Sequence, residues 1–450
     1  MSAIEQLADF VSDPDRKPPA DAIQVSRDAL IDTIACCYAG ADQPVTRNSI
    51  AAMQGWGGGK AKVFGTGASL AAPFAALVNG GSAHALDFDD FDGPANAHPS
   101  AVIFPAILAL ATEHNVTGWQ LLDAHVVGVE VMQRLGEAMN MDHYRRGWLT
   151  TLTLGSLGAA AACARLAGAD FKTAAASLSL ASSMASGLTN QGGFQAKQLN
   201  PGFAAKNGVM AHALAAAGVD ASHQVIDGPI SLARSMGDYD AGKFTAALAK
   251  LGKPWSILEY GLITKAYPSC GYTHRLIDAA IELHGKLPQS TRDIDSIQIS
   301  IPDYYLDLLV YPRPGNTAEA MFSAEYNVAA ALLRGQFGLA ELAPESIFDD
   351  TLKKLTSLCQ VTPRSPLDPD TVYDPDDPDR VEVSFANGER CEARVGLPTG
   401  SPQKPMSEAQ CRDKFDQCLQ GHMDSSDRSG LWQQLNQFEQ LQNLDFLLAD

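Results

Sequence analysis

Apolar residues recur every three to four positions through most of the first 265 residues, which is the spacing of helices that bury one face. Gly, Asn or Asp bounds these segments, as is common where helices end. Many of their faces carry Ala, Gly and Ser, which let neighbouring helices approach closely. The pattern predicts helices within residues 28–41, 74–86, 100–114, 118–139, 153–169, 171–188 and 208–218.

The pattern changes near Lys265. Residues 293–305 alternate isoleucines with polar residues and predict a strand, and residues 381–395 predict a hairpin that turns at Asn387 and Gly388. Between them, residues 324–336 predict a helix. The Pro- and Asp-rich residues 363–380 have too few N–H donors for the centre of a sheet and predict a connection.

The residues from Ser407 to the end are helical again and are expected to fold back onto the first helices. The fold class predicted is mainly α with a smaller α+β domain. We expect a large all-helical bundle domain at residues 1–266 and 401–450, and an inserted α+β domain at residues 267–400.

Composition restricts the function. The chain has 450 residues, of which 46% are hydrophobic and 19% charged, as in a folded soluble protein. Its net charge of −19 argues against a nucleic-acid partner, and an anionic substrate would need local cations. The 8 cysteines form no CxxC pair, and neither a signal peptide nor a long apolar run is evident. We therefore expect a cytoplasmic enzyme with no membrane partner.

The segment from His84 to Ser100 concentrates four aspartates, Asp87, Asp89, Asp90 and Asp92, ahead of His98. Like charges and burial would both raise carboxyl pKa values, which suits proton transfer. Two alternatives are an acidic solvated loop and a divalent-cation site that uses carboxylate oxygens. The cation site is the less favoured, because no EF-hand glycine pattern accompanies it, and we predict no metal.

Three further segments could carry chemistry. Residues 265–275 form a turn that gathers five polar or reactive side chains, unless they are only the basic start of a helix. Residues 192–208 place Lys206 at the entry to a helix, where it could bind a carboxylate with Lys197. Residues 143–148, taken alone, are typical of a basic loop before a helix. The side chains in the first and third segments are Lys265, Tyr267, Cys270, His274 and Arg275, and His143, Tyr144, Arg145 and Arg146.

Six ordered strings resemble the MmgE/PrpD family, which includes 2-methylcitrate dehydratase, cis-aconitate decarboxylase and iminodisuccinate epimerase. They are DTIACCYAG, VNGGSAHALDFDD with the following HPS, GVEV with HYRRGW, AAKNGVMA, KAYPSCGYTHR and FSAEYNVAAALLRG. The resemblance implies a helical domain split by an α+β lid, a homodimer, and a site between the domains. It also implies a small carboxylate substrate and no cofactor.

The resemblance also assigns residues. The family's site would fall on Asp87, His98, Lys197, Lys265, Cys270, His274 and Tyr326, with Tyr144 and Lys265 at the positions of the bases in the epimerase branch. Three positions depart from the family pattern. Leu149 and Asn200 stand where a histidine is expected, and Phe91 stands where Thr or Ser is common. These losses of polar groups point to a changed substrate or a changed reaction.

The expected chemistry begins with a proton transfer next to a carboxylate, so that cations must stabilise an enolate. We expect Lys197, His274 and Arg275 to do so, with Lys265 as the base and with His98, oriented by Asp87, as a general acid. Cys270, Tyr326 and Leu149 are expected at the substrate. The first hypothesis is a dehydratase or decarboxylase. An epimerase or isomerase that uses Tyr144 and a catalytically silent binding protein are the alternatives.

Overall fold

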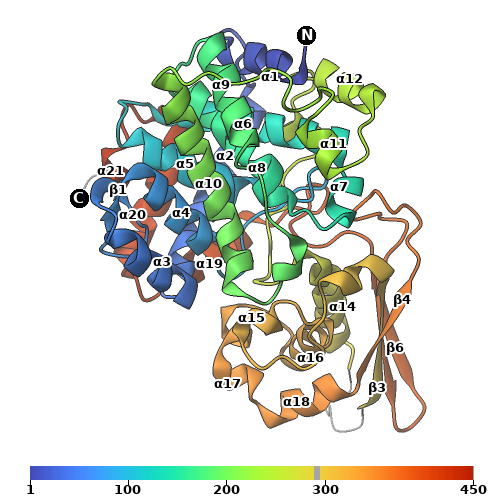
Figure 1. Cartoon of the computed structure of the whole chain (residues 1–450). Coiled ribbons are helices and arrows are strands. Elements are labelled where there is room, and N and C mark those ends of the chain that lie inside the picture. Colours follow the sequence, from blue (N-terminus) through green and yellow to red (C-terminus); the bar gives the residue numbers. More distant parts are fainter. Residues whose placement is uncertain (288–293, 449–450) are drawn as a thin grey trace.

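A computed structural model describes residues 1–287 and 294–448. A helical bundle lies beside a smaller part that contains a four-stranded sheet (Figure 1). The helices of the bundle are α1 (Ala3–Ser12), α2 (Ala20–Gly40), α3 (Pro44–Gln54), α4 (Ala72–Ala83), α5 (Pro99–Ala111), α6 (Gly118–Met139), α7 (Asp142–Arg145), α8 (Thr150–Leu166), α9 (Phe171–Ser182), α10 (Gln195–Ala216), α11 (Leu232–Met236), α12 (Ala241–Ala249) and α13 (Ser256–Glu259).

The helices α4, α5, α8 and α10 pack together at the centre of the bundle. Every residue of α5 is buried, as its almost entirely apolar sequence predicts. Glycines allow α4 and α10 to touch, because a Cβ atom at Gly202 would lie 2.0 Å from the carbonyl oxygen of Leu77. The prediction that small residues bring helices close together is confirmed.

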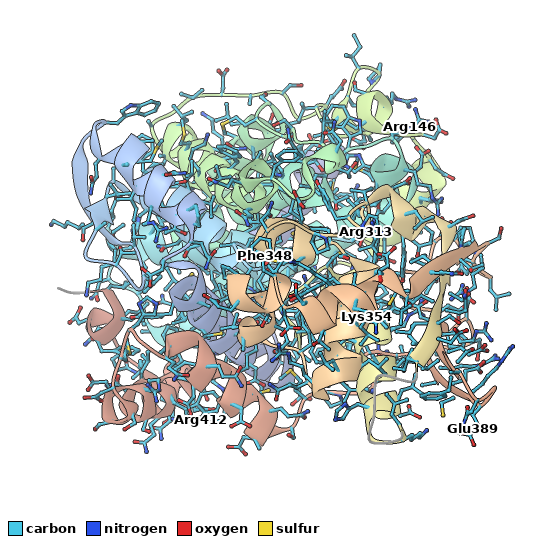
Figure 2. The ribbon with its side chains drawn as sticks, turned by 90° about the horizontal axis from the view of Figure 1, so that it is seen from below. Arg146, Arg313, Phe348, Lys354, Glu389 and Arg412 are labelled. Carbon is cyan, nitrogen blue, oxygen red and sulfur yellow. The ribbon has the colours of Figure 1, made fainter. Side chains whose placement is uncertain are left out.

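The larger sheet has the order β4-β3-β5-β6. Its strands are β3 (Ile294–Pro302), β4 (Cys359–Arg364), β5 (Asp379–Phe385) and β6 (Arg390–Val395), and only the β3–β4 pair is parallel. The strand and the hairpin were both predicted correctly, and Gly388 takes the left-handed conformation that the turn requires, with φ of 88°. The turn reaches the outer edge of the molecule near Glu389 (Figure 2). Residue 293, where the predicted strand starts, lies outside the described residues.

Strand β4 was not predicted. It lies at the edge of the sheet, so the missing N–H of Pro363 does not interrupt the hydrogen bonds between inner strands. The strand ends at Arg364, inside the segment expected to be a connection. The helices beside the sheet are α14 (His274–His284), α15 (Thr317–Ala320), α16 (Ala324–Arg334), α17 (Pro344–Ile347) and α18 (Asp350–Ser357). Helix α16 confirms the predicted helix between the strand and the hairpin.

The C-terminal helices return to the bundle, as predicted. They are α19 (Glu408–Leu419), α20 (Ser425–Leu435) and α21 (Asp445–Leu448), and α19 packs against α2. A short pair of strands, β1 (Gly58–Lys62) and β2 (Ser69–Leu70), completes this part. The fold is thus mainly α with a smaller α+β part, and the boundaries at residues 266 and 400 stay a prediction. No helix in the described part of the chain is long and apolar enough to cross a bilayer.

Candidate active site between the bundle and the α+β part

The aspartate-rich segment connects α4 to α5 inside the protein. Its four aspartates are each at most 2% exposed, so the alternative of a solvated acidic loop is wrong. The backbone of Phe91 pairs with that of Ile263 through hydrogen bonds of 3.1 and 2.8 Å, which brings Lys265 beside the segment. Asp87 itself has a positive φ of 49°, an uncommon conformation for a residue with a Cβ atom.

The Asp87 carboxylate lies between two ammonium groups. Lys197 Nζ, from α10, donates to Oδ2 at 2.6 Å. Lys265 Nζ donates to Oδ1 and, at 2.8 Å, to the main-chain carbonyl of Asp87. Burial alone would raise the pKa of Asp87, but Lys197 and Lys265 hold it well below its usual value. Asp87 is therefore a carboxylate, and both lysines act as hydrogen-bond donors.

His98 is oriented by Asp89 and Asp90 rather than by Asp87. Its Nδ1 atom lies 2.9 Å from the carbonyl oxygen of Asp90 and 3.2 Å from Asp89 Oδ2, so Nδ1 carries the hydrogen. Nε2 is then a proton acceptor, 3.9 Å from Asp87 Oδ1. Burial lowers the pKa of His98 to about 4. The expectation that Asp87 orients His98 is therefore wrong, and the role of His98 as a general acid stays a prediction.

The pKa values of the four aspartates shift in two directions. Burial raises the pKa of Asp90 to about 8 and that of Asp92 to about 7, as expected for a crowded acidic segment. The pKa of Asp89, like that of Asp87, moves the other way, because His84 and His98 outweigh the effect of burial. The expectation of raised pKa values is therefore right for Asp90 and Asp92 and wrong for Asp87 and Asp89.

A small cavity of about 50 Å³ lies against this cluster. Both parts of the protein line it, through residues of the bundle and of the 270–322 region. Seven of the residues singled out from the sequence are in its wall: Asp87, Phe91, His98, Tyr144, Leu149, Lys197 and Cys270. The remaining wall residues were not singled out individually, although Asn96, Gly271, Tyr272 and Phe322 lie in segments named above; the others are Thr151, Thr189 and Leu308.

Lys265 is fully buried and lies behind Asp87, outside the cavity wall. Tyr144 and Cys270 face the cavity as neutral groups. Burial raises the pKa of Cys270 to about 11, and burial, with a smaller contribution from Cys270, raises the pKa of Tyr144. A phenol that keeps its proton can donate it, but it is a poor base at neutral pH.

Arg275 and Tyr326, expected at the substrate, lie within the α+β part. The Arg275 guanidinium donates to Asp379 at 2.7 and 3.0 Å and to three main-chain carbonyls. The Tyr326 hydroxyl donates to the carbonyl oxygen of Glu341. The hydrogen-bond donors of both side chains are thus occupied inside the α+β part, because α14 and α16 direct these side chains toward the sheet or a neighbouring helix.

His274 and Asn200 also lie outside the cavity wall. His274 Nε2 is 3.3 Å from the carbonyl oxygen of Ser269, and burial lowers the pKa of His274 to about 3. An uncharged His274 would not act as a cation. Asn200 donates to carbonyls of its own helix, and Lys206 lies in the middle of α10 rather than at its entry. Arg145 and Arg146 are exposed, and Arg146 lies at the rim of the molecule (Figure 2).

One residue that the sequence did not single out completes the cluster. Lys414, on α19, is 5% exposed and donates to Asp32 at 2.6 Å, to the carbonyl of Phe88 at 2.7 Å and to the carbonyl of Lys265 at 2.9 Å. Lys414 belongs to no sequence motif, and its spacing from other residues in this polar helical segment does not identify it as a site residue.

Four residues offer atoms that a metal ion could bind. One ligand atom from each of His84, Asp87, Asp89 and His98 lies within 4.8 Å of the others. However, both carboxylate oxygens of Asp87 already accept hydrogen bonds from ammonium groups. A divalent ion would have to displace Lys197 or Lys265, so the donor set fits a metal poorly and we assign none to it.

Comparison with known proteins identifies the family of this chain. The MmgE/PrpD N-terminal domain matches residues 5–245 and the MmgE/PrpD C-terminal domain matches residues 267–437. The cis-aconitate decarboxylase-like protein oryM of Aspergillus oryzae is 28% identical over 434 residues, which are 90% of this chain and 88% of that protein. A cis-aconitate decarboxylase of Aspergillus terreus is 25% identical over 88% of this chain and 85% of its own length.

The mouse cis-aconitate decarboxylase is 28% identical over 76% of this chain and 70% of its own length. The two domain matches together cover most of the chain, and the second begins at residue 267, next to Lys265, where the sequence pattern changes. The chain therefore belongs to the MmgE/PrpD family, and it is a lyase of that family.

Proposed function

We propose that the protein releases carbon dioxide from a small carboxylic acid bound against Asp87, using only groups of its own chain. The observation that carries the proposal is the buried row Lys197, Asp87 and Lys265 beside the neutral imidazole of His98. The names of the relatives support decarboxylation over dehydration.

The reaction breaks the bond between the departing carboxylate and its neighbouring carbon. The electron pair left on that carbon moves into a conjugated second carboxylate, and this dianionic enolate needs positive charge nearby. Lys197 supplies it, since its ammonium group is in the cavity wall. The carbon then takes a proton from Lys197 Nζ, and the amine regains one from water. The sum is one carboxylate and one proton in, carbon dioxide and the protonated product out.

Asp87 and Lys265 position Lys197 for this step. The carboxylate holds the ammonium at 2.6 Å, and Lys265 balances the charge of Asp87 from the buried side. This assignment revises the expectation that Lys265 is the base, because its Nζ is hydrogen-bonded to Asp87 and Lys265 lies outside the cavity wall. His98 Nε2 is the group able to accept a proton, and it would serve where a hydrogen next to the carboxylate must be removed first.

An epimerase is the second candidate, because His98 and Tyr144 both reach the cavity. A base and a phenol in one cavity can remove a proton and return one to the other face of the same carbon. Such a reaction exchanges hydrogen without losing carbon, which separates it experimentally from a lyase.

Incubation in deuterated water with a panel of di- and tricarboxylic acids, followed by NMR, tests both. We expect loss of a carboxylate and one deuterium in the product. Deuterium exchange without carbon loss would favour the epimerase, and ligand binding without any change would favour the silent binding protein. Lys197→Met should lower turnover at least about 100-fold. Lys206→Met, on the same helix but outside this cavity, is the matched control.

We also propose a homodimer, as the resemblance implies. Light scattering on the eluting protein over a range of concentrations would give twice the monomer mass of 47.8 kDa. A mass that stays at the monomer value at every concentration would contradict it.

A further inference from the structure

The wall of the active-site cavity carries two kinds of side chain. Asp87, His98 and Lys197 are charged or ionisable. Leu149, Leu308 and Phe322, which we call the apolar side, are hydrocarbon, and Phe322 adjoins Lys197. Among the described residues of this wall, Lys197 is the one cation, and it is already paired with Asp87.

This charge balance limits the substrate. A carboxylate taken out of water needs a cation or several hydrogen-bond donors, or it is bound at a large cost in free energy. Lys197 can serve one carboxylate, and the neutral donors Asn96, Thr151 and Tyr144 could serve a second. A third would add another negative charge beside a lysine that is already paired, with the Thr189 and Tyr272 hydroxyls and the Cys270 thiol as the remaining side-chain donors.

The apolar side is held firmly in place. Leu149 is 8% exposed, and its backbone is fixed at the start of α8 by a hydrogen bond from its N–H to the Gly187 carbonyl at 3.0 Å. Phe322 is 2% exposed, and its ring centroid lies 5.1 Å from Lys197 Nζ. An apolar substituent next to the carboxylate at Lys197 would therefore find an apolar wall already formed.

We infer that the substrate carries two carboxylates and a short alkyl group that packs against Leu149, Leu308 and Phe322, and that it is not a tricarboxylic acid. This inference rests on the proposed function for the location of the site. Each methylene that the apolar side buries should strengthen binding about fourfold, until the substituent outgrows the space.

Calorimetric titration tests the inference by binding alone. The ligands are maleate, methylmaleate, ethylmaleate and propylmaleate, with cis-aconitate as the tricarboxylic acid. We expect affinity to rise along the alkyl series and the methyl and ethyl compounds to bind at least about tenfold more tightly than cis-aconitate. Equal or tighter binding of cis-aconitate, or an alkyl series that does not rise, would overturn the inference.

Two histidine variants add a matched comparison. Leu149→His introduces a donor into the apolar side and should reverse the preference, with at least about a tenfold gain for cis-aconitate relative to ethylmaleate. Leu188→His introduces the same group at a 47% exposed position outside this cavity and should leave the preference unchanged. An unchanged preference in Leu149→His would count against the inference, provided circular dichroism shows the variant to be folded.

Measuring carbon dioxide release from the same acids distinguishes the proposed decarboxylase function from the inferred substrate class. Turnover that is fastest with cis-aconitate would support the proposed function and overturn the inferred substrate class. Binding that follows the alkyl series without release from any acid would support the substrate class and count against a decarboxylase.

Discussion

Lys414 Nζ donates to the main-chain carbonyl of Lys265 at 2.9 Å, across a separation of 149 residues. The same ammonium group donates to the carbonyl of Phe88, the residue that follows Asp87. Its charge is balanced by Asp32 on α2, at 2.6 Å. One buried lysine thus ties together the two segments that supply Asp87 and Lys265, and we regard it as a positioning residue.

Replacing Lys414 should affect both stability and activity. Lys414→Met leaves Asp32 buried without its cation and should lower the free energy of unfolding by about 3 kcal/mol. It also removes the donor that holds the Phe88 and Lys265 carbonyls, so kcat should fall at least about tenfold. Urea unfolding and steady-state kinetics measure the two effects.

The double variant Lys414→Met with Asp32→Asn separates them. Neutralising Asp32 should restore much of the stability, because no unpaired charge remains buried. The rate should stay low if Lys414 positions the site. Recovery of both quantities together would mean that Lys414 acts on stability alone.

The pH dependence of stability should report the buried neutral Asp90. Burial raises its pKa to about 8 from the ordinary 3.8, so between these values the native state binds a proton that the unfolded chain has released. This contribution makes stability fall as pH rises, by up to about 1.4 kcal/mol per pH unit. Asp90→Asn mimics the protonated form and removes the fall.

Urea unfolding of the parent and of Asp90→Asn at pH 5, 6 and 7 measures this effect, and the advantage of the variant should grow with pH. Asp92→Asn should behave similarly, with its rise ending near pH 7, since burial raises the pKa of Asp92 to about 7. A difference between parent and variant that is constant over this range would show that both groups are ionised in the folded protein.

The pH profile of kcat/KM should report His98 if the reaction removes a proton. Burial lowers its pKa to about 4, so the base is available over the neutral range and the acid limb should lie near pH 4. His98→Gln should lose at least about 100-fold in kcat/KM. His212→Gln, on α10 outside the cavity wall, should keep the parent profile.

A limb near the ordinary histidine pKa would contradict this environment for His98. The measurement needs a stability control, because a histidine with a lowered pKa in the fold also costs stability as pH falls from about 6.5 towards 4. Circular dichroism at each pH shows whether lost activity reflects protonation or unfolding.

Arg275 should matter for stability and not for substrate. Arg275→Met removes the bidentate partner of the buried Asp379 and the donor to three carbonyls, so the free energy of unfolding should fall by about 3 kcal/mol. KM of the folded variant should stay within about twofold of the parent, because no part of the cavity wall changes. A large rise in KM would restore Arg275 as a substrate ligand.

Residues 265–275 show where prediction from sequence succeeds and where it stops. The turn places Cys270 in the cavity wall and Lys265 beside Asp87, as their nearness in sequence to the turn indicated. His274 and Arg275 follow directly but begin α14, and each helical residue turns its side chain by about 100° from the one before. Those side chains therefore enter the packing of the α+β part.

The histidine at 98 shows a second limit. Its place in the site follows from the aspartates around it. Its tautomer depends on the main-chain carbonyl of Asp90, and because every residue has such a carbonyl, the sequence does not mark this one as the partner. Lys414 shows a third, because its role arises only when α19 packs on α2. Side-chain periodicity predicts elements well, whereas main-chain acceptors and contacts between distant elements become visible only in the folded protein.

The cavity of about 50 Å³ has room for only a few water molecules, so an organic acid fits only if the cavity widens. Widening it by separating the two parts would break polar contacts between them. These contacts include Arg145 to Asp370 and to the Pro369 carbonyl, Lys404 to Asp278, Tyr311 to the Gly192 carbonyl, and Asn96 to Tyr272. Opening of the cavity, rather than the chemical step, would then limit kcat, and a more viscous solvent would lower kcat.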